Sequence, residues 1–216
     1  MLKIVAVENR HLLILDVGGA YLNAKINNAA YMFLAPNLVN ILLNICPHFV
    51  KFRDHKGRML VQIDKAMYGL VQSARLWYNT ITGVLERDGV APNPMDPCVW
   101  NKKVNENQTT LVIYVDDLAI SSKSKEDVHA VVRLIQNEFV DVKVKVTYEM
   151  SYLGMNLKLT KEGIEVDMIN YIEEILEEYD GVHEYTHPAD DHLFVSGDTK
   201  GTSKDPKKIH RIVAKL

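Results

Sequence analysis

Residues 109–121 read Thr-Thr-Leu-Val-Ile-Tyr-Val-Asp-Asp-Leu-Ala-Ile-Ser. Two apolar runs, Thr109–Val115 and Leu118–Ser121, lie on either side of an Asp-Asp pair. Short apolar runs with a polar break between them are typical of two strands that are joined by a turn. The stretch therefore predicts a strand pair that carries Asp116 and Asp117 at its tip.

A third acid follows an apolar run near the start of the chain. His11–Asp16 contains the continuous apolar run Leu12–Leu15 and predicts a buried strand that ends in a carboxylate. Burying a carboxylate is costly unless something compensates for the lost hydration. A hard cation such as Mg²⁺ would compensate, because it prefers oxygen ligands. If the two strands are neighbours, Asp16 and Asp116 could share such a site.

The relation between the two adjacent acids follows from strand geometry. Neighbouring side chains on a regular strand point to opposite faces, so we rank Asp116 above Asp117 as the partner of Asp16. The alternative is that the Asp-Asp pair is ordinary turn chemistry, in which the carboxylates bond to nearby backbone.

The rest of the chain mixes helices and strands without the regular alternation of parallel units. We predict a helix at Gln72–Arg87, ended by Asp88-Gly89, and another at Lys125–Phe139 with Ser124 as N-cap. This mixture favours an α+β fold with an antiparallel sheet and packed helices. The weaker patterns predict a helix or turn at Ala20–Lys25, a hairpin of Phe49–Phe52 with Met59–Ile63, a loop at Pro92–Pro97, strands at Cys98–Lys102, Val140–Thr147, Tyr152–Leu159 and Ile164–Asp167, helices at Ile169–Tyr179 and Ile209–Leu216, and a loop-rich segment at Thr186–Pro206.

Composition limits the classes of protein to consider. The chain has 216 residues, of which 47% are hydrophobic and 25% charged, which suits one globular domain or one large and one small subdomain. Disordered and collagen-like chains are excluded, and no apolar run approaches the ~18 residues of a membrane span. Cys46 and Cys98 are too few for a disulfide framework or a four-ligand zinc site, and we expect reduced thiols, with a single bridge as the alternative.

The charges are unevenly distributed. The formal net charge is −3, whereas nucleic-acid binders usually carry a basic footprint. Residues 51–103 hold nine basic and five acidic side chains, and residues 162–180 are strongly acidic. A basic middle is compatible with a local groove for a polyanion, and a solvated surface is the alternative.

Five short blocks stand in one order along the chain. They are Leu15–Asn23 (LDVGGAYLN), Lys65–Tyr78 (KAMYGLVQSARLWY), Asp96–Trp100 (DPCVW), Tyr114–Asp117 (YVDD) and Tyr152–Met155 (YLGM). In this order they resemble the reverse transcriptases of copia-type LTR retrotransposons. Gly19 and Ala74 depart from the family pattern, in which a polar residue and a proline are frequent.

The resemblance implies a metal-dependent site. Asp16, Asp116 and Asp117 match the family's metal-binding catalytic carboxylates, and the carbonyl of Val17 would add a ligand. Two Mg²⁺ ions, with Mn²⁺ as a substitute, would activate the primer 3′-hydroxyl and neutralise the departing pyrophosphate. Phosphoryl transfer depends on this positioning and charge neutralisation more than on covalent chemistry from the protein.

The resemblance also implies a nucleotide site. Gly18, Gly19 and Ala20 would let a triphosphate approach the backbone amides closely. Tyr21 matches the aromatic gate against a ribose 2′-hydroxyl, and Gln72 matches a glutamine that contacts the incoming nucleotide. The alternatives are a core aromatic for Tyr21 and a polar helix-start residue for Gln72.

Template and primer contacts are implied at two further places. Arg75 and Tyr114 would contact nucleic acid, although a solvated helix arginine is the alternative for Arg75. The hairpin that would grip the primer end has three residues at its centre: Leu153, Gly154 and Met155. Lys143 or Lys145 would give a proton to pyrophosphate.

The implied organisation is a palm with partial fingers at 1–158, the fingers part at about 25–64, and a thumb-like or connecting start at 159–216. We expect most of the fingers to be missing, and hence weak substrate binding. The implied partners are an RNA template, a DNA or RNA primer and deoxynucleoside triphosphates, without a membrane. A dimer or association with other Pol segments is also implied, in cytoplasmic virus-like particles with access to the nucleus.

Two alternatives to polymerase activity stay open. The chain could be an inactive remnant that binds nucleic acid or a protein partner. It could also be another two-metal palm enzyme, such as a nucleotidyl cyclase or a phosphodiesterase, and the Gln72 block argues against that assignment.

Overall fold

The computed structural model describes residues 1–104, 106–145, 149–160 and 162–178. Two compact units divide the chain: residues 1–147 with 161–164 form the first, and residues 148–160 with 165–216 form the second. The predicted helix at Ile209–Leu216 and the predicted loops at Thr186–Pro206 lie outside the described residues. No helix in the described ranges is long and apolar enough to cross a membrane.

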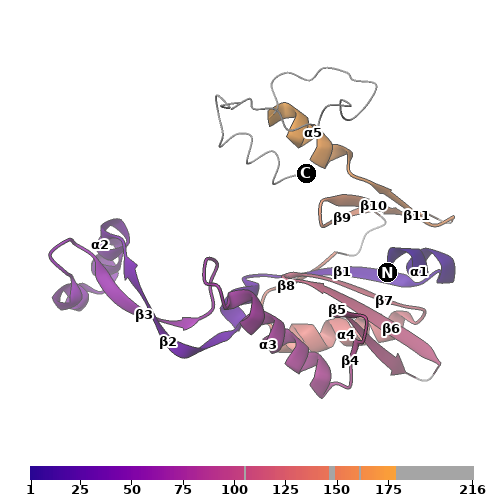
Figure 1. The fold of residues 1–216 in the computed structure, drawn as a ribbon, viewed down its shortest axis with the longest axis horizontal. Helices are drawn as coiled ribbons and strands as arrows, with labels where there is room; N and C mark the ends of the chain where they lie inside the picture. Colours follow the sequence, from indigo (N-terminus) through magenta and orange to yellow (C-terminus); the bar gives the residue numbers. More distant parts are fainter. Residues whose placement is uncertain (105, 146–148, 161, 179–216) are drawn as a thin grey trace, which may run out of the picture. The chain divides into compact units, whose positions relative to one another are not determined.

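A six-stranded antiparallel sheet organises the first unit (Figure 1). Its strand order is β4-β5-β6-β7-β1-β8, so the first long strand of the chain lies between two strands from much later in the sequence. The predicted α+β class with an antiparallel sheet is confirmed. The strands are β1 (His11–Val17), β4 (Ala91–Asn93), β5 (Asp96–Val104), β6 (Asn107–Tyr114), β7 (Asp117–Ser122) and β8 (Val142–Lys145).

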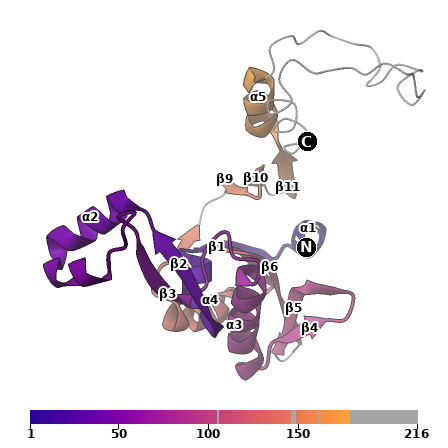
Figure 2. The same cartoon turned by 60° about the vertical axis from the view of Figure 1, so that its left-hand side comes forward.

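Two amphipathic helices, α3 (Ser73–Arg87) and α4 (Lys125–Glu138), lie together on one face of this sheet (Figure 2). Both end as the sequence predicts. Gly89 adopts φ 75° just after α3, and Ser124 Oγ accepts the Asp127 amide at 3.1 Å at the start of α4. The helices share one hydrophobic core with the strands, and its fully buried members include Trp77, Leu15, Ile81, Leu85, Leu118, Ile120 and Ile135.

A second, two-stranded sheet precedes α3 and corrects one prediction. Met59–Ile63 pairs with β2 (Lys25–Leu34) as part of β3 (Met59–Lys65), and not with Phe49–Phe52. Phe49–Phe52 instead forms part of a 3-10 helix, η2 (Pro47–Phe52), which begins at a proline. The sequence pattern predicts a local hairpin, whereas the observed register joins two strands that α2 (Pro36–Ile45) and η2 separate along the chain.

Some weaker predictions also need correction. The prolines at 92–97 do not exclude a strand, because β4 (Ala91–Asn93) pairs with β5 at the edge of the sheet, where proline is tolerated. The predicted turn or helix after β1 is confirmed as the 3-10 helix η1 (Ala20–Asn23). Val140–Thr147 is strand only at β8 within the described residues.

The second unit contains a three-stranded sheet of order β11-β10-β9 and a helix. Its elements are β9 (Glu149–Tyr152), β10 (Met155–Leu159), β11 (Ile164–Asp167) and α5 (Ile169–Glu178). The predicted strand at Tyr152–Leu159 is broken, because Leu153 and Gly154 adopt φ 51° and 77° and form the turn between β9 and β10. Two successive positive φ values are the pattern of a type I′ hairpin turn.

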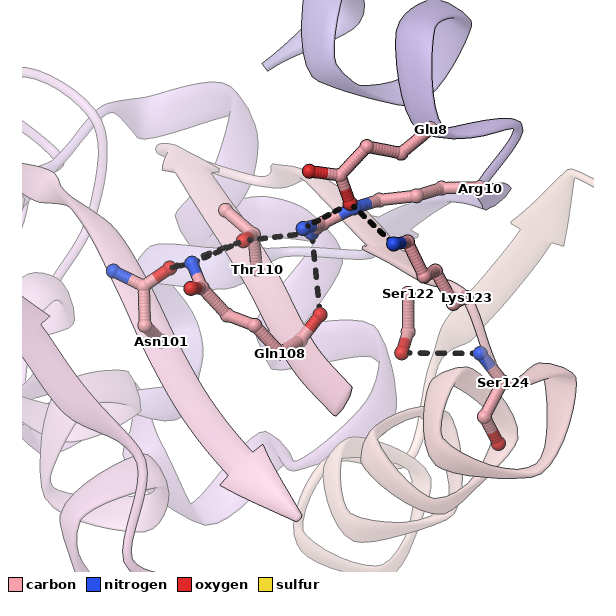
Figure 3. Close-up of polar contacts among 8 residues, drawn as sticks. All are labelled: Glu8, Arg10, Asn101, Gln108, Thr110, Ser122, Lys123 and Ser124. Atoms are coloured by element: carbon pink, nitrogen blue, oxygen red, sulfur yellow. Dashed lines mark hydrogen bonds and ion pairs between the residues drawn. The ribbon is translucent and has the colours of Figure 1, made fainter. Parts of the chain in front are cut away.

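An N-terminal helix that the sequence analysis did not predict, α1 (Leu2–Glu8), is tied to the sheet by a buried arginine (Figure 3). The side chain of Arg10 is 6% exposed, and its Nε donates to Glu8 Oε2 at 3.0 Å. Its Nη1 donates to the Gln108 carbonyl at 3.2 Å and to Thr110 Oγ1 at 3.3 Å, both on β6. The hydrogen bond from Arg10 also lowers the pKa of Glu8.

Arg10→Gln should lower the free energy of unfolding by about 1–3 kcal/mol, because it leaves buried groups without a charged partner. Arg87→Gln is the matched control, since Arg87 pairs with Glu138 at the surface at 3.2 Å and such pairs contribute about 0–1 kcal/mol. Urea unfolding of both variants measures the difference. Equal losses of unfolding free energy in the two variants would show that the hydrogen bonds of Arg10 do not anchor α1 to β6.

Candidate active site

Four residues on four adjacent strands form one row across the first unit's sheet. Tyr114 on β6 lies opposite Asp117 on β7, Asp117 lies opposite Asp16 on β1, and Asp16 lies opposite Lys143 on β8. Direct cross-strand partners share one face of a sheet. We call Tyr114, Asp117, Asp16 and Lys143 the carboxylate row.

The carboxylate row lies on the sheet face opposite to the one that α3 and α4 cover. Leu15 and Val17, the neighbours of Asp16 along β1, are fully buried members of the core that these helices cover. Because side chains alternate along a strand, Asp16 points to the other face. Tyr114 is 59% exposed, so this end of the row reaches solvent.

The backbone brings the two aspartates of the row close together. The Val17 amide donates to the Asp116 carbonyl at 2.9 Å, which makes Val17 and Asp116 a hydrogen-bonded pair. The next pair along, Asp16 with Asp117, is then of the non-hydrogen-bonded kind, in which the Cα atoms are about 4.5 Å apart. Asp117, and not Asp116, is therefore the direct cross-strand partner of Asp16, and the ranking of Asp116 above Asp117 at a shared cation stays a prediction.

The reason lies in the turn between β6 and β7. Val115 and Asp116 are its two central residues, and Val115 adopts φ 54°. A positive φ at the first central residue alone is the pattern of a type II′ turn. Asp116 is thus a turn residue, and the strand rule applies only to Asp117. A β-branched residue at positive φ is strained by about 1–3 kcal/mol.

Asp117 lies within electrostatic reach of Asp16 and of the turn residue Asp116. Burial raises the pKa of Asp117, Lys145 opposes the rise, and the charges of Asp116 and Asp16 add to it. Three carboxylates that repel one another and lie beside two lysines form a site that is ready for a cation or for the phosphates that a cation carries.

The segment after β1 keeps its backbone close to the row. The Gly18 amide donates to the Asp141 carbonyl at 2.7 Å, and a Cβ at Gly18 would overlap the Asp141 carboxylate. Gly19 adopts φ 58°, which favours glycine. Ala20 is buried and starts η1, which carries Tyr21.

A residue that the sequence analysis missed, Tyr68, lies beside Tyr21 and the aspartates. The two tyrosine rings are 4.5 Å apart at their centroids. Partial burial raises the pKa of Tyr68, and the charges of Asp116, Tyr21 and Asp16 add to the rise. The segment is held by Ser73, whose Oγ donates to the Met67 carbonyl at 2.6 Å. Tyr68 belongs to the quoted block at residues 65–78, but a tyrosine in such a block carries no sign that it faces a carboxylate.

The remaining predicted residues fall into two groups. Gln72 is the exposed N-cap of α3, and Arg75 is exposed in its first turn. The helix α3 packs against η1, the element that carries Tyr21. Leu153 and Gly154 form the turn of the β9–β10 hairpin and Met155 begins β10, so these three residues belong to the second unit.

The donor set of the row suits a divalent cation. Carboxylate oxygens are the ligands that Mg²⁺ prefers, and the mutual repulsion at Asp117 is what a cation would relieve. Among the residues that the structure describes, no three acidic, histidine or cysteine side chains are already arranged to hold a metal. A cation bound here would take its other ligands from water and substrate phosphates, as Mg²⁺ commonly does.

A protein-family comparison covers most of the chain. Residues 1–189 match the model of the family described as reverse transcriptase (RNA-dependent DNA polymerase). The match includes all four residues of the carboxylate row.

Curated relatives are Pol polyproteins of transposons. The chain is 29% identical over 57% of its length to the retrovirus-related Pol polyprotein from transposon TNT 1-94 of Nicotiana tabacum. It is 26% identical over 78% of its length to the transposon Ty1-BL Gag-Pol polyprotein of Saccharomyces cerevisiae. It is 24% identical over 75% of its length to the retrovirus-related Pol polyprotein from transposon RE1 of Arabidopsis thaliana. It covers 9%, 8% and 10% of these relatives. The predicted resemblance to copia-type polymerases is confirmed.

A solved structure also resembles the chain, at 11% identity and a TM-score of 0.41. It is an apo telomerase from Candida tropicalis truncated from its C-terminal domain, and the likeness covers 73% of this chain and 35% of that one.

Asp117→Asn should raise the melting temperature at pH 7. The pKa of the Asp117 carboxyl is higher in the folded than in the unfolded protein. Its contribution to folding stability is therefore complete below the unfolded pKa and is lost as the pH rises through the folded pKa. Asparagine stays neutral, so we expect a gain of up to about 2 °C at pH 7, limited by solvent screening.

The gain should vanish near pH 3, where the aspartate is itself protonated. Thermal melts at both pH values measure it, with Asp64→Asn on β3 as an exposed control. An equal gain at both pH values, or an equal gain from Asp64→Asn, would contradict the account of charge repulsion.

Proposed function

The chain belongs to the reverse transcriptase (RNA-dependent DNA polymerase) family, and we propose that it extends a primer 3′-hydroxyl on an RNA template with deoxynucleoside triphosphates. The carboxylate row is the observation that carries the proposal. It places Asp16 opposite Asp117, directly beside the turn residue Asp116, on the sheet face opposite to α3 and α4. We assign the six-stranded unit to the palm.

The three aspartates are proposed to hold two divalent cations, with the Val17 carbonyl as a further ligand. When bound, Mg²⁺ or Mn²⁺ supplies charge neutralisation and a more acidic 3′-hydroxyl. The chain itself supplies position: the β1–β7 register fixes Asp16 against Asp117, and the turn fixes Asp116. Positioning and electrostatics account for most of the catalysis in phosphoryl transfer.

Lys143 is the better of the two candidate lysines for giving a proton to pyrophosphate. Lys143 lies directly opposite Asp16 in the row, whereas Lys145 lies opposite Ile14, one pair further along β1. A general acid must be within hydrogen-bond reach of the group that it protonates. A pyrophosphate that leaves beside Asp16 is therefore closer to Lys143.

The incoming nucleotide is proposed to lie over the segment after β1. Gly18, Gly19 and Ala20 would offer backbone amides to the triphosphate, and Tyr21 would close the pocket beside the sugar. The ring contact with Tyr68 supports the position of Tyr21. Exposed Gln72 would contact the nucleotide, and exposed Arg75 a phosphate.

The nucleic-acid partners are an RNA template and a DNA or RNA primer. Tyr114, exposed at the end of the row, would contact the primer, and the hairpin at Leu153–Met155 would grip it. The same proposal includes partial fingers at 25–64 and a thumb-like start at 159–216. It also includes a dimer or association with other Pol segments, and action in cytoplasmic virus-like particles with access to the nucleus.

Primer extension on a primed RNA template tests the activity. The purified chain should add deoxynucleotides with Mg²⁺ or Mn²⁺, and Asp117→Asn should lower the rate by about 100-fold or more, because it removes charge that the transition state needs.

Asp127→Asn is the matched control, since this aspartate lies on α4, on the other side of the sheet from the carboxylate row. The extension rate of this variant should stay near that of the parent. A folded chain that binds primed template but extends it with neither metal would contradict the proposal and leave a nucleic-acid-binding remnant.

Tyr21→Ala should lower the preference for deoxynucleotides over ribonucleotides, because the small side chain no longer meets the 2′-hydroxyl. We expect the ratio of the two kcat/KM values to fall about tenfold or more, a loss of about 1.4 kcal/mol in discrimination. Tyr31→Ala, at an exposed tyrosine of β2, is the control. An unchanged ratio would remove Tyr21 from the gate.

A further inference from the structure

A buried tryptophan on the helix-covered side of the sheet bonds to the strained turn between β6 and β7. Trp77 lies on α3 and is 1% exposed. Its indole Nε1 donates to the carbonyl oxygen of Val115 at 2.6 Å. This bond joins residues that are far apart in the sequence, and it connects the helix-covered core directly to the turn that carries Asp116.

The carbonyl of Val115 belongs to the central peptide group of the turn. In a two-residue hairpin turn, the strand ladder holds the flanking residues, and the central peptide group can rotate between turn types. Rotation of that group changes the backbone of Asp116 and therefore the direction of its side chain. A donor on the Val115 carbonyl fixes the rotation.

The strain at Val115 makes such a restraint necessary. A β-branched residue at φ 54° is held in a sparsely populated conformation, and it persists only where its surroundings determine it strongly. No glycine relieves the turn. The hydrogen bond from Trp77 is a restraint of this kind, because it forms only when the Val115 carbonyl points toward the indole N–H.

Trp77 is itself held rigidly. Its ring meets the ring of Phe139 edge-on, with centroids 5.1 Å apart, and Phe139 is the C-cap of α4. Ile81 and Leu85 on α3 are fully buried in the same core. The indole therefore links α3 and the end of α4 directly to the turn.

We propose that Trp77 is a positioning residue that orients Asp116 for catalysis by fixing the Val115–Asp116 peptide group. The proposal rests on the proposed polymerase function. Because Trp77 is buried and touches no substrate, it affects the chemical step and not nucleotide binding. Its replacement should therefore change kcat and leave KM for the deoxynucleotide unchanged.

The chain contains a matched control in its second tryptophan. Trp100 on β5 is 2% exposed, and its indole Nε1 donates to the carbonyl of Pro97 at 3.0 Å. The two tryptophans thus share size, burial and the type of hydrogen bond. They differ in the carbonyl that accepts, since Pro97 lies only three residues away and has no part in the turn.

The experiment compares two replacements at each tryptophan. Phenylalanine removes the indole, and benzothienylalanine keeps the shape of the indole but replaces its N–H with sulfur. Each protein is measured for kcat and KM in primer extension, for melting temperature, and for the amide signals of Val115 and Asp116 in ¹H–¹⁵N NMR spectra. Benzothienylalanine keeps the test valid if Trp77→Phe fails to fold.

Both Trp77 replacements should lower kcat about five- to tenfold, with KM changed less than about twofold, and should shift or broaden the Asp116 amide signal. The Trp100 replacements should leave kcat and that signal unchanged, whatever their effect on melting temperature. A folded Trp77 variant with parental kcat and Asp116 signal, or equal losses of kcat at Trp100, would overturn the proposal.

The two proposals fail in different ways. A parent chain that extends no primer contradicts the polymerase function. The Asp116 amide then still decides whether Trp77 orients the turn, because a signal that is unchanged in the benzothienylalanine protein rejects the restraint without any activity measurement.

Discussion

The pairing of β1 with β7 is the constraint on which the site depends, because it places Asp16 opposite Asp117. Burial raises the pKa of Asp117, and the charges of Asp116 and Asp16 add to the rise, while Lys145 opposes it. The fold tolerates the arrangement because the core on the other face of the sheet is continuous, from β1 through α3 and α4.

Two further features bring charge and strain to the same place. The β1–β8 pairing sets Lys143 opposite Asp16, and the charge of Lys145 on the same strand opposes the rise in the pKa of Asp117. The β6–β7 turn strains Val115 and brings Asp116 next to the row. Strain of this kind is typical of functional sites, where surrounding structure holds an unfavourable backbone in place. Here, the indole of Trp77 is the contact that bonds to the strained residue.

Sequence reasoning predicted the parts of the structure that local patterns determine. The apolar run at 12–15, the amphipathic helices at α3 and α4 and the cap at Ser124 are confirmed, because periodicity and capping are local properties. It predicts the wrong partner for β3, and it does not predict that Asp117 rather than Asp116 lies directly opposite Asp16. Both features depend on tertiary pairing, and the second also depends on a positive φ at a valine that no sequence rule predicts. Tyr68 and Trp77 were missed for the same reason.

Paramagnetic broadening by Mn²⁺ in ¹H–¹⁵N NMR spectra of the intact chain tests the central claim, that the carboxylate row is a divalent-cation site. At low ratios of metal to protein, the amides of Asp16, Val17, Asp116 and Asp117 should broaden first, and excess Mg²⁺ should reverse the effect. The second unit has its own acidic pocket, lined by Glu149, Glu165 and Asp167, and it serves as an internal comparison. Broadening that is centred on that pocket, or spread evenly over the acidic surface, would contradict the claim.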